Sequence, residues 1–247
     1  MIKFFRHIRK SLIQENKMGK YFKYAIGEII LVVVGILIAL QINNWNEARK
    51  SNQLEQALYL KLLENLENDL ILMYENDSTF RLHEDIHYNF FNTIIGKASY
   101  DSTIHYGKFR WAVNFDPTFK DNYQNKVDAI SNDTVRDAVI NYFKIEQKTE
   151  RIVAFFEKLK ADVVRPYITN NNLMNLNDVY VGKRYQEVDT RNSVNYEALS
   201  KKLNTLEFKQ ILYELKIKIS AGLQNLRELK QANKTLQNII KGQLKND

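Results

Sequence analysis

Apolar residues form one uninterrupted run near the start of the chain and become periodic after it. The run extends from Tyr24 to Ile42, YAIGEIILVVVGILIALQI, and includes a single charged side chain, Glu28. As a helix this run would extend about 28 Å, close to the ~30 Å hydrocarbon core of a bilayer. Aromatic residues flank it at Phe22 and Trp45, as in the interfacial belts of spanning helices. The pattern therefore predicts a transmembrane helix over residues 24–42.

A cleaved signal peptide and a buried core helix are the alternatives for this run. A signal peptide fits poorly because the basic segment ahead of the run, residues 1–23, is long, and bulky side chains follow the end of the run at Ile42, where a small-x-small cleavage site would be needed. A core helix would more often show a polar face, which residues 29–40 lack. We therefore expect a retained anchor.

Beyond the anchor, apolar residues recur every three or four positions, which is typical of amphipathic helices. The first of these helices is predicted to run on from the membrane helix, or nearly so, and to end at Gly96. The second begins at Asn132 or Asp133, which are suited to capping, and extends to about Arg165, just before Pro166. With only two prolines and eight glycines in the chain, long helices are expected.

A third helix is predicted after Asn204 and Glu207, which resemble a capping box, and it extends to about Lys241. It carries a seam with 3-4-3-4 spacing that is typical of a coiled coil, but we favour an ordinary bundle helix because the seam spans few heptads. The seam consists of Leu226, Leu229, Asn233, Leu236 and Ile240.

Two stretches lack this periodicity, residues 96–132 and residues 169–195, and both are rich in polar and turn-forming residues. We expect loops with short helices in the first, and a short β-pair around residues 179–181 is a weaker alternative within the second. The fold class is therefore all-α, with one N-terminal transmembrane helix followed by an extracytoplasmic helical bundle built from long helices.

The net charge of +7 is concentrated ahead of the anchor. Residues 1–23 carry seven Lys and Arg side chains against Glu15 alone, a net charge of +6, whereas the rest of the chain carries only +1. The positive-inside rule therefore places residues 1–23 in the cytoplasm and the predicted helical domain, residues 43–247, in the periplasm of a Gram-negative bacterium. The near-neutral body gives no support for nucleic-acid binding. The sequence has no cysteine, which excludes disulfides and thiol catalysis.

The basic tail has its own apolar periodicity, because Ile2, Phe5, Ile8 and Leu12 recur every three or four residues among basic side chains. A helix lying on the anionic surface of the lipid bilayer fits this pattern. A short unstructured tail that only sets the topology fits equally well.

A family resemblance is carried by the anchor and the residues around it, ENKMGKYFKYAIGEIILVVVGILIALQINNWNEARK. This segment resembles the N-terminal signature of a family of uncharacterised bacterial single-span proteins common in Bacteroidota. The later segment SNDTVRDAVINYF (Ser131–Phe143) is weakly similar to a helix of that family, whereas the segment from Asp116 to Lys126 departs from its pattern. The resemblance implies an inner-membrane protein with a helical extracytoplasmic domain, and it implies no activity and no catalytic residues.

One face of the predicted transmembrane helix combines Glu28 with Gly35 and Ala39, which each lie within about 20° of Glu28 around the helix at 100° per residue. The pair Gly35-x-x-x-Ala39 is a small-xxx-small motif that would let a second helix approach closely, so this face is a candidate for helix pairing. The alternative is that Glu28, near the start of the span, only reaches toward the lipid headgroups near the basic tail.

The sharpest chemical motif is HEDIH, from His83 to His87, which fits the H-E-x-x-H pattern. On a helix it would present two imidazoles one turn apart to zinc, with Glu84 as the general base. The site needs a third ligand, but the glycine and the third histidine of the extended pattern are missing, because Phe90, Phe91 and Asn92 follow the motif. His105 could supply it only through a fold that the sequence does not reveal. An incidental motif on a solvated helix face is therefore the favoured interpretation.

No phosphate-binding loop, nucleophile elbow or dinucleotide-binding loop is present in the sequence. We therefore expect no cofactor and no catalysis. The expected function is that of a membrane-anchored scaffold, adaptor or sensor that acts through a protein partner, either a second copy or another membrane protein. A sensor would have to signal through that partner, because the segment expected inside, residues 1–23, is too short for a signalling domain. The alternative is a membrane-tethered zinc hydrolase that uses His83, Glu84 and His87.

Overall fold

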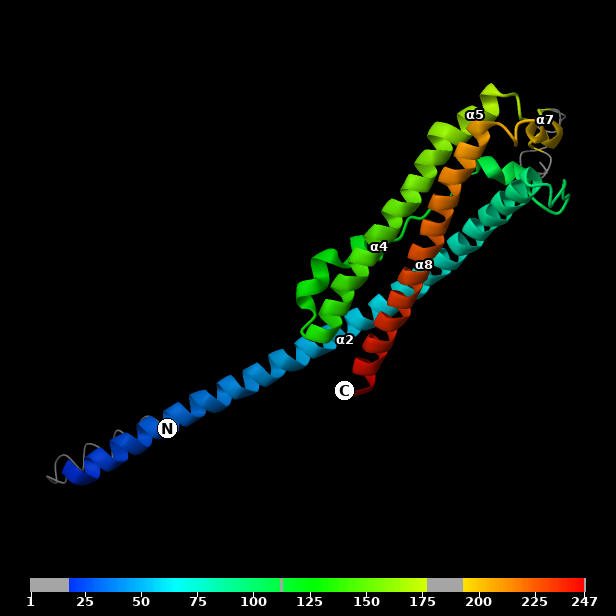
Figure 1. Cartoon of the computed structure of the whole chain (residues 1–247). Coiled ribbons are helices and arrows are strands. Elements are labelled where there is room, and N and C mark those ends of the chain that lie inside the picture. The colour runs from blue at the N-terminus through cyan, green and yellow to red at the C-terminus, as the bar shows by residue number, and fades with distance from the viewer. Residues whose placement is uncertain (1–17, 112, 177–192, 247) are drawn as a thin grey trace. The chain divides into compact units, whose positions relative to one another are not determined.

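The structure is a computed structural model that describes residues 18–111, 113–176 and 193–246. Long helices dominate it (Figure 1), as the all-α prediction requires. The described elements are α2 (Met18–Ile94), η1 (Tyr106–Arg110), α3 (Phe119–Tyr123), η2 (Gln124–Ala129), α4 (Asp133–Leu159), η3 (Lys160–Val164), α5 (Arg165–Asn170), α7 (Tyr196–Ser200) and α8 (Leu206–Asn246).

The described ranges contain no β-strand, and an isolated antiparallel bridge joins Met174 to Val194. Two expectations lie outside the described residues: the short β-pair around residues 179–181 and the surface helix of the basic tail. The irregular stretch between α2 and α4 contains η1, α3 and η2, so the prediction of loops with short helices is confirmed there.

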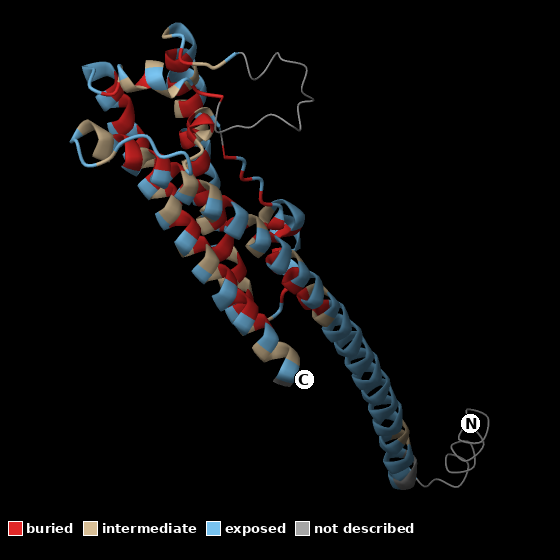
Figure 2. Ribbon diagram, turned by 90° about the vertical axis from the view of Figure 1, so that its right-hand side faces the viewer, coloured by how far each residue is buried: buried red, intermediate tan, exposed pale blue. Residues whose placement is uncertain are grey.

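The chain divides into two units, residues 1–57 and residues 58–247, and the division falls within α2. In the first unit, the apolar side chains of the predicted span are exposed, and none of its most apolar window is buried. Figure 2 shows this part of α2 in pale blue. The structure thus contains, near the N-terminus, a helix long and apolar enough to cross a membrane. A buried core helix, by contrast, would be covered by protein.

The second unit is a bundle of three helices, the part of α2 after residue 57, α4 and α8. Their buried positions recur at alternating spacings of three and four, which turns one continuous face of each helix inward. On α2 these positions run from Tyr59 to Phe90, and on α4 they run from Val135 into η3 at Lys160. On α8 they run from Phe208 to Ile240 and include the whole predicted seam. This seam therefore packs inside the unit, as an ordinary bundle helix would.

Polar groups join all three helices at one level of the core. The side-chain amide of Asn233, which is fully buried, donates to the carbonyl oxygen of Leu66 at 2.9 Å and to the hydroxyl of Tyr142 at 3.2 Å. A buried amide with these partners is satisfied only in one register. The seam asparagine thus aligns α8 with α2 and α4.

The helix ends differ from the sequence predictions in two places. Asn132 caps α4 as expected, since its side chain accepts from the amide of Val135 at 3.1 Å. However, the helical path does not end at Arg165, because a π turn, η3, leads from α4 directly into α5, and Pro166 lies in the first turn of α5, where proline is tolerated. At the start of α8, the hydroxyl of Thr205 accepts from the amide of Phe208 at 3.3 Å, so the cap lies one residue after the predicted Asn204.

Candidate functional site

The HEDIH segment lies on α2 in the second unit, and its first histidine is part of the core. His83 is 3% exposed, and its ring makes an edge contact with Phe156 at 5.1 Å between ring centroids. Burial lowers the pKa of His83 to about 2, with smaller contributions from the charges of Lys160 and Lys108. The imidazole is therefore neutral, and its Nε2 is buried without a hydrogen-bond partner among the described residues.

The second histidine of the motif is held by backbone. Nε2 of His87 lies 2.9 Å from the carbonyl oxygen of Leu212 on α8. Because a carbonyl only accepts, this nitrogen carries the proton and is not free to bind a metal in this arrangement. Burial also lowers the pKa of His87, whereas Glu84 is exposed. In the described part of the chain, no three His, Cys, Asp or Glu side chains lie close enough together to hold a metal ion.

The candidate helix-pairing face lies in the first unit. Gly35 and Ala39 are exposed on α2, and Glu28 is half-buried. A methyl group placed on Gly35 would meet no atom of the described chain within 4 Å. Gly35 and Ala39 therefore leave room for an approaching helix, and pairing through this face stays a prediction.

A groove lined largely by apolar side chains runs between α2 and α8 in the second unit. It has a volume of about 480 Å³. We call it the α2–α8 groove, and we define it by Tyr88, Phe91 and Ile94 from α2 and Lys209, Tyr213 and Lys216 from α8.

The aromatic walls of the groove stand in solvent. Tyr88 is 64% exposed, Phe91 is 49% exposed and Tyr213 is 66% exposed. Each lies off the buried 3-4 face of its helix, where a polar residue is usual. Clustered exposed aromatic side chains with few polar neighbours are typical of surfaces that bind other molecules.

The groove continues along α8 into a second hollow, which shares Glu84 and Ser220 with the first and extends to Arg227 and Glu228. Three cations, Lys209, Lys216 and Arg227, therefore line the two hollows, and their side chains form no ion pair with any residue that the structure describes. The two hollows therefore combine aromatic and aliphatic side chains with an excess of positive charge.

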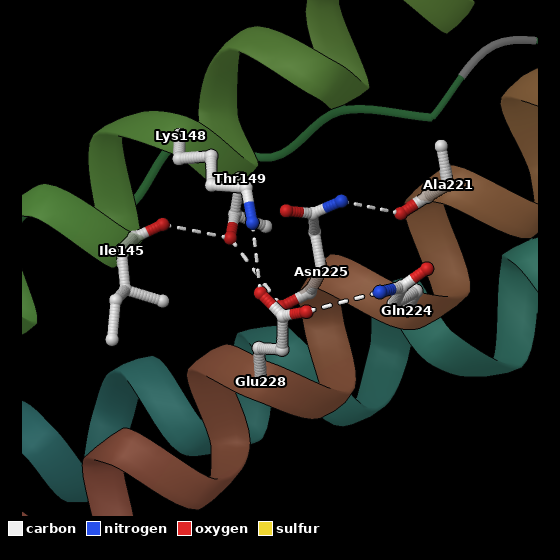
Figure 3. A network of polar contacts seen from close by, with 7 residues as sticks. All are labelled: Ile145, Lys148, Thr149, Ala221, Gln224, Asn225 and Glu228. Carbon is white, nitrogen blue, oxygen red and sulfur yellow. Dashed lines mark hydrogen bonds and ion pairs between the residues drawn. The ribbon is translucent and has the colours of Figure 1, made fainter.

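Glu228 does not offset this charge, because a network between α4 and α8 engages it (Figure 3). Its carboxylate accepts from Lys148 at 2.9 Å and from the amide of Gln224 at 3.2 Å. The Lys148 and Gln224 hydrogen bonds lower the pKa of Glu228. In the same network, the Thr149 hydroxyl lies 3.4 Å from the carbonyl oxygen of Asn225, which ties the two helices together beside the ion pair.

Two buried acids hold a short helix against the bundle. Asp69 on α2 accepts from the backbone amides of Thr118 and Phe119, and Glu146 on α4 accepts from the amide of Lys120 at 3.2 Å. These amides belong to the N-terminus of α3, where a carboxylate is favourable. Burial nevertheless raises the pKa of both acids, that of Glu146 to about 8, and the charge of Asp69 adds to the cost of ionising Glu146. The two acids thus form a coupled pair, and each retains an oxygen without a partner among the described residues.

Sequence reasoning missed both the groove and the acid pair. The acid pair had a readable signal, because Asp69 and Glu146 fall in step with the apolar positions of their helices. The groove had a weaker one, since Tyr88, Phe91 and Tyr213 stand at positions where solvent-facing side chains were expected. In both cases the sequence does not show which distant segment of the chain completes the site.

A family model with the description "Family of unknown function (DUF6090)" matches residues 28–99. The matched segment includes most of α2 and agrees with the expectation of an uncharacterised family. No curated protein and no solved structure matches the chain.

Proposed function

We propose that the protein is a single-pass, membrane-anchored binding module that works without catalysis, as a scaffold, adaptor or sensor acting through a protein partner. The observation that carries this proposal is the α2–α8 groove. The unit has a well-packed core, and yet one open surface holds large aromatic side chains and three cations that have no ion-pair partner in the described ranges. Such a surface costs solubility unless a partner covers it.

The proposed location is the inner membrane of a bacterial cell, with the N-terminus in the cytoplasm and residues 43–247 in the periplasm. Support comes from the apolar helix near the N-terminus and from the net charge of +6 ahead of it. A reporter enzyme that is active only in the periplasm, fused after Asp247, is expected to be active. A cytoplasm-specific reporter at the same place serves as the control, and its activity would contradict the orientation.

Crosslinking in native membranes tests the proposed function. Cells that produce the full chain are treated with a membrane-permeable crosslinker, and the chain is purified under denaturing conditions. We expect one or a few distinct proteins to be attached, at ratios that do not occur with an unrelated single-pass protein of similar abundance. Crosslinks to the chain alone, or none, would contradict an adaptor function.

The zinc-hydrolase alternative has less support. His83 is packed against Phe156, and the protonated nitrogen of His87 faces a carbonyl oxygen. Metal analysis of the purified full chain, with H83A as the comparison, separates the two functions. Zinc bound at one equivalent in the natural protein and lost in H83A would favour the hydrolase.

A further inference from the structure

We infer that the α2–α8 groove binds an acidic amphipathic helix of a partner protein. This inference rests on the proposed function and adds to it the chemistry of the partner and the surface that receives it. Three features carry it: the shape of the groove, its charge, and the poor fit of the occupants that the chain itself could offer.

The shape fits a helix better than a small molecule. Along α8 the two joined hollows extend from Lys209 to Arg227, which at 1.5 Å per residue is about 27 Å, or five helical turns. Small-molecule sites enclose most of their ligand, but Tyr88 and Tyr213 are each about two-thirds exposed. An open furrow between two helices is the surface in which a third helix seats its apolar face.

The charge selects an acidic partner. Lys209 and Lys216 are seven residues apart on α8, so they lie on one side of that helix, and Arg227 continues the series. The acidic residues that line the furrow are Glu84, which is exposed, and Glu228, which is paired with Lys148. His87 is held neutral at physiological pH by its lowered pKa. A helix with Leu-like residues at three- and four-residue spacing, flanked by Asp and Glu, would match both features.

The chain itself is a poor occupant. Its N-terminal segment, residues 1–23, carries a net charge of +6, which the cations of the groove would repel. In a two-fold pairing of two copies through this surface, the same cationic patch lies on both sides of the interface. The cations of one copy would then face a surface that carries the same excess of cations, which is unfavourable.

Site-specific photo-crosslinking in membranes tests the inference. A photo-reactive amino acid replaces Tyr213 or Tyr88 in the groove, and replaces Phe155, a 48% exposed residue of α4, as the positional control. The captured peptides are sequenced by mass spectrometry. We expect the groove positions to capture a net-negative segment with apolar residues at helical spacing, and we expect the Phe155 position not to capture it.

Charge reversal provides the second readout. K209E/K216E is expected to lower the crosslinking yield by about tenfold, because the electrostatic attraction becomes repulsion. The matched control is K144E/R151E, which reverses two exposed residues with the same spacing of seven on α4 and is expected to leave the yield unchanged. All four side chains are exposed, so both variants should fold, and thermal melts of the full chain verify this.

Each other outcome overturns the inference. Groove crosslinks to a second copy make the surface a self-interface, and crosslinks to lipid make it a membrane-contact or acyl-chain site. An unchanged yield in K209E/K216E removes the acidic partner. If a partner is captured in native membranes but never from the groove positions, the binding-module function stands and the groove assignment fails.

Discussion

At the scale of single residues, the charged groups of the core are the most informative, because each needs a partner that its own helix cannot supply. Asp69, Glu146 and Lys160 all occupy inward positions where an apolar residue is usual. Glu146 and Asp69 use backbone amides at the start of α3, and Lys160 donates to the carbonyl oxygen of Phe109. The core polar groups therefore fasten the segment between α2 and α4 onto the bundle.

Glu146 should make the stability of the unit depend on pH. Burial raises its pKa to about 8 from an ordinary 4.5, so the folded state keeps a proton that the unfolded state releases between these values. The free energy of unfolding should therefore fall as the pH rises from about 4.5 to about 8. E146Q keeps the acceptor for Lys120 and removes the titration. We expect it to equal the natural protein near pH 4 and to exceed it at pH 8 by on the order of a few kcal/mol.

Urea unfolding of the full chain in detergent micelles, followed by circular dichroism at several pH values, measures this difference. The matched control is E150Q, one turn further along the exposed side of α4; the charge of Glu150 is the smallest of the causes that raise the pKa of Glu146, so this change should alter the pH dependence far less than E146Q. A difference between E146Q and the natural protein that does not grow with pH would contradict the assignment.

Gly222 on α8 should tolerate no side chain. A methyl group built on it would lie 2.5 Å from the ring of Phe80, which is fully buried. G222A is therefore expected to destabilise the unit by about 1–3 kcal/mol through overpacking. On the same helix, the methyl of G242A meets no atom of the described chain within 4 Å, so this change should be neutral or should stabilise by up to about 1 kcal/mol. Thermal unfolding measures both, and F80L in the G222A background should restore part of the loss.

At the scale of elements, α3 depends on α2 and α4 for its position. D69A removes the acceptor of two amides at the N-terminus of α3. A loss of about 1–2 kcal/mol of local stability corresponds to roughly a 5- to 30-fold faster amide exchange. Hydrogen exchange by mass spectrometry should show this acceleration in residues 113–130 and not in the middle of α8. D69N, whose amide oxygen still accepts, should show a smaller effect, and equal acceleration throughout the unit would contradict a local role.

The long helices were predictable, and their tertiary connections were not. The positions of α4 and α8 could be predicted because apolar residues that recur every three or four positions form one continuous face of a helix, and that face is buried. Asp69, Glu146 and Lys160 fall at the same spacing as these apolar residues. Their burial depends on partners in the segment between α2 and α4, and a local pattern of apolar residues cannot identify partners that are distant in the sequence. The end of the second helix was misplaced for a local reason, because a proline can close a helix or begin the next turn, and Pro166 does the latter.

The same limit applies to the candidate sites. The HEDIH motif could be recognised in the sequence because its residues are close together in the chain. Whether its imidazoles can bind a metal depends on Phe156 and Leu212, which contact them in the fold and are distant in the sequence. The groove arises only when Tyr88 and Tyr213, 125 positions apart in the sequence, line one hollow.

At the scale of the whole molecule, the division after residue 57 predicts that the second unit folds without the first. It contains the three helices and the core described above. A chain of residues 58–247 should therefore keep a cooperative thermal transition within a few degrees of the full chain. The comparison is a chain that starts at residue 74, which lacks the buried Leu62, Leu66 and Met73 and should lose cooperativity. Loss of the transition in the longer fragment would show that the unit needs its anchor to fold.

The buried amine of Lys160 can report on opening of the helical core. Its ammonium nitrogen lies 4.8 Å and 5.0 Å from the ring centroids of Phe109 and Phe156, the side chain is 1% exposed, and burial lowers its pKa to about 7. Amine-acylating reagents need an accessible, unprotonated nitrogen, so surface lysines would react at once and Lys160 only when the helices part. The rate at which that one amine is acylated would therefore report how often the core of the natural chain opens.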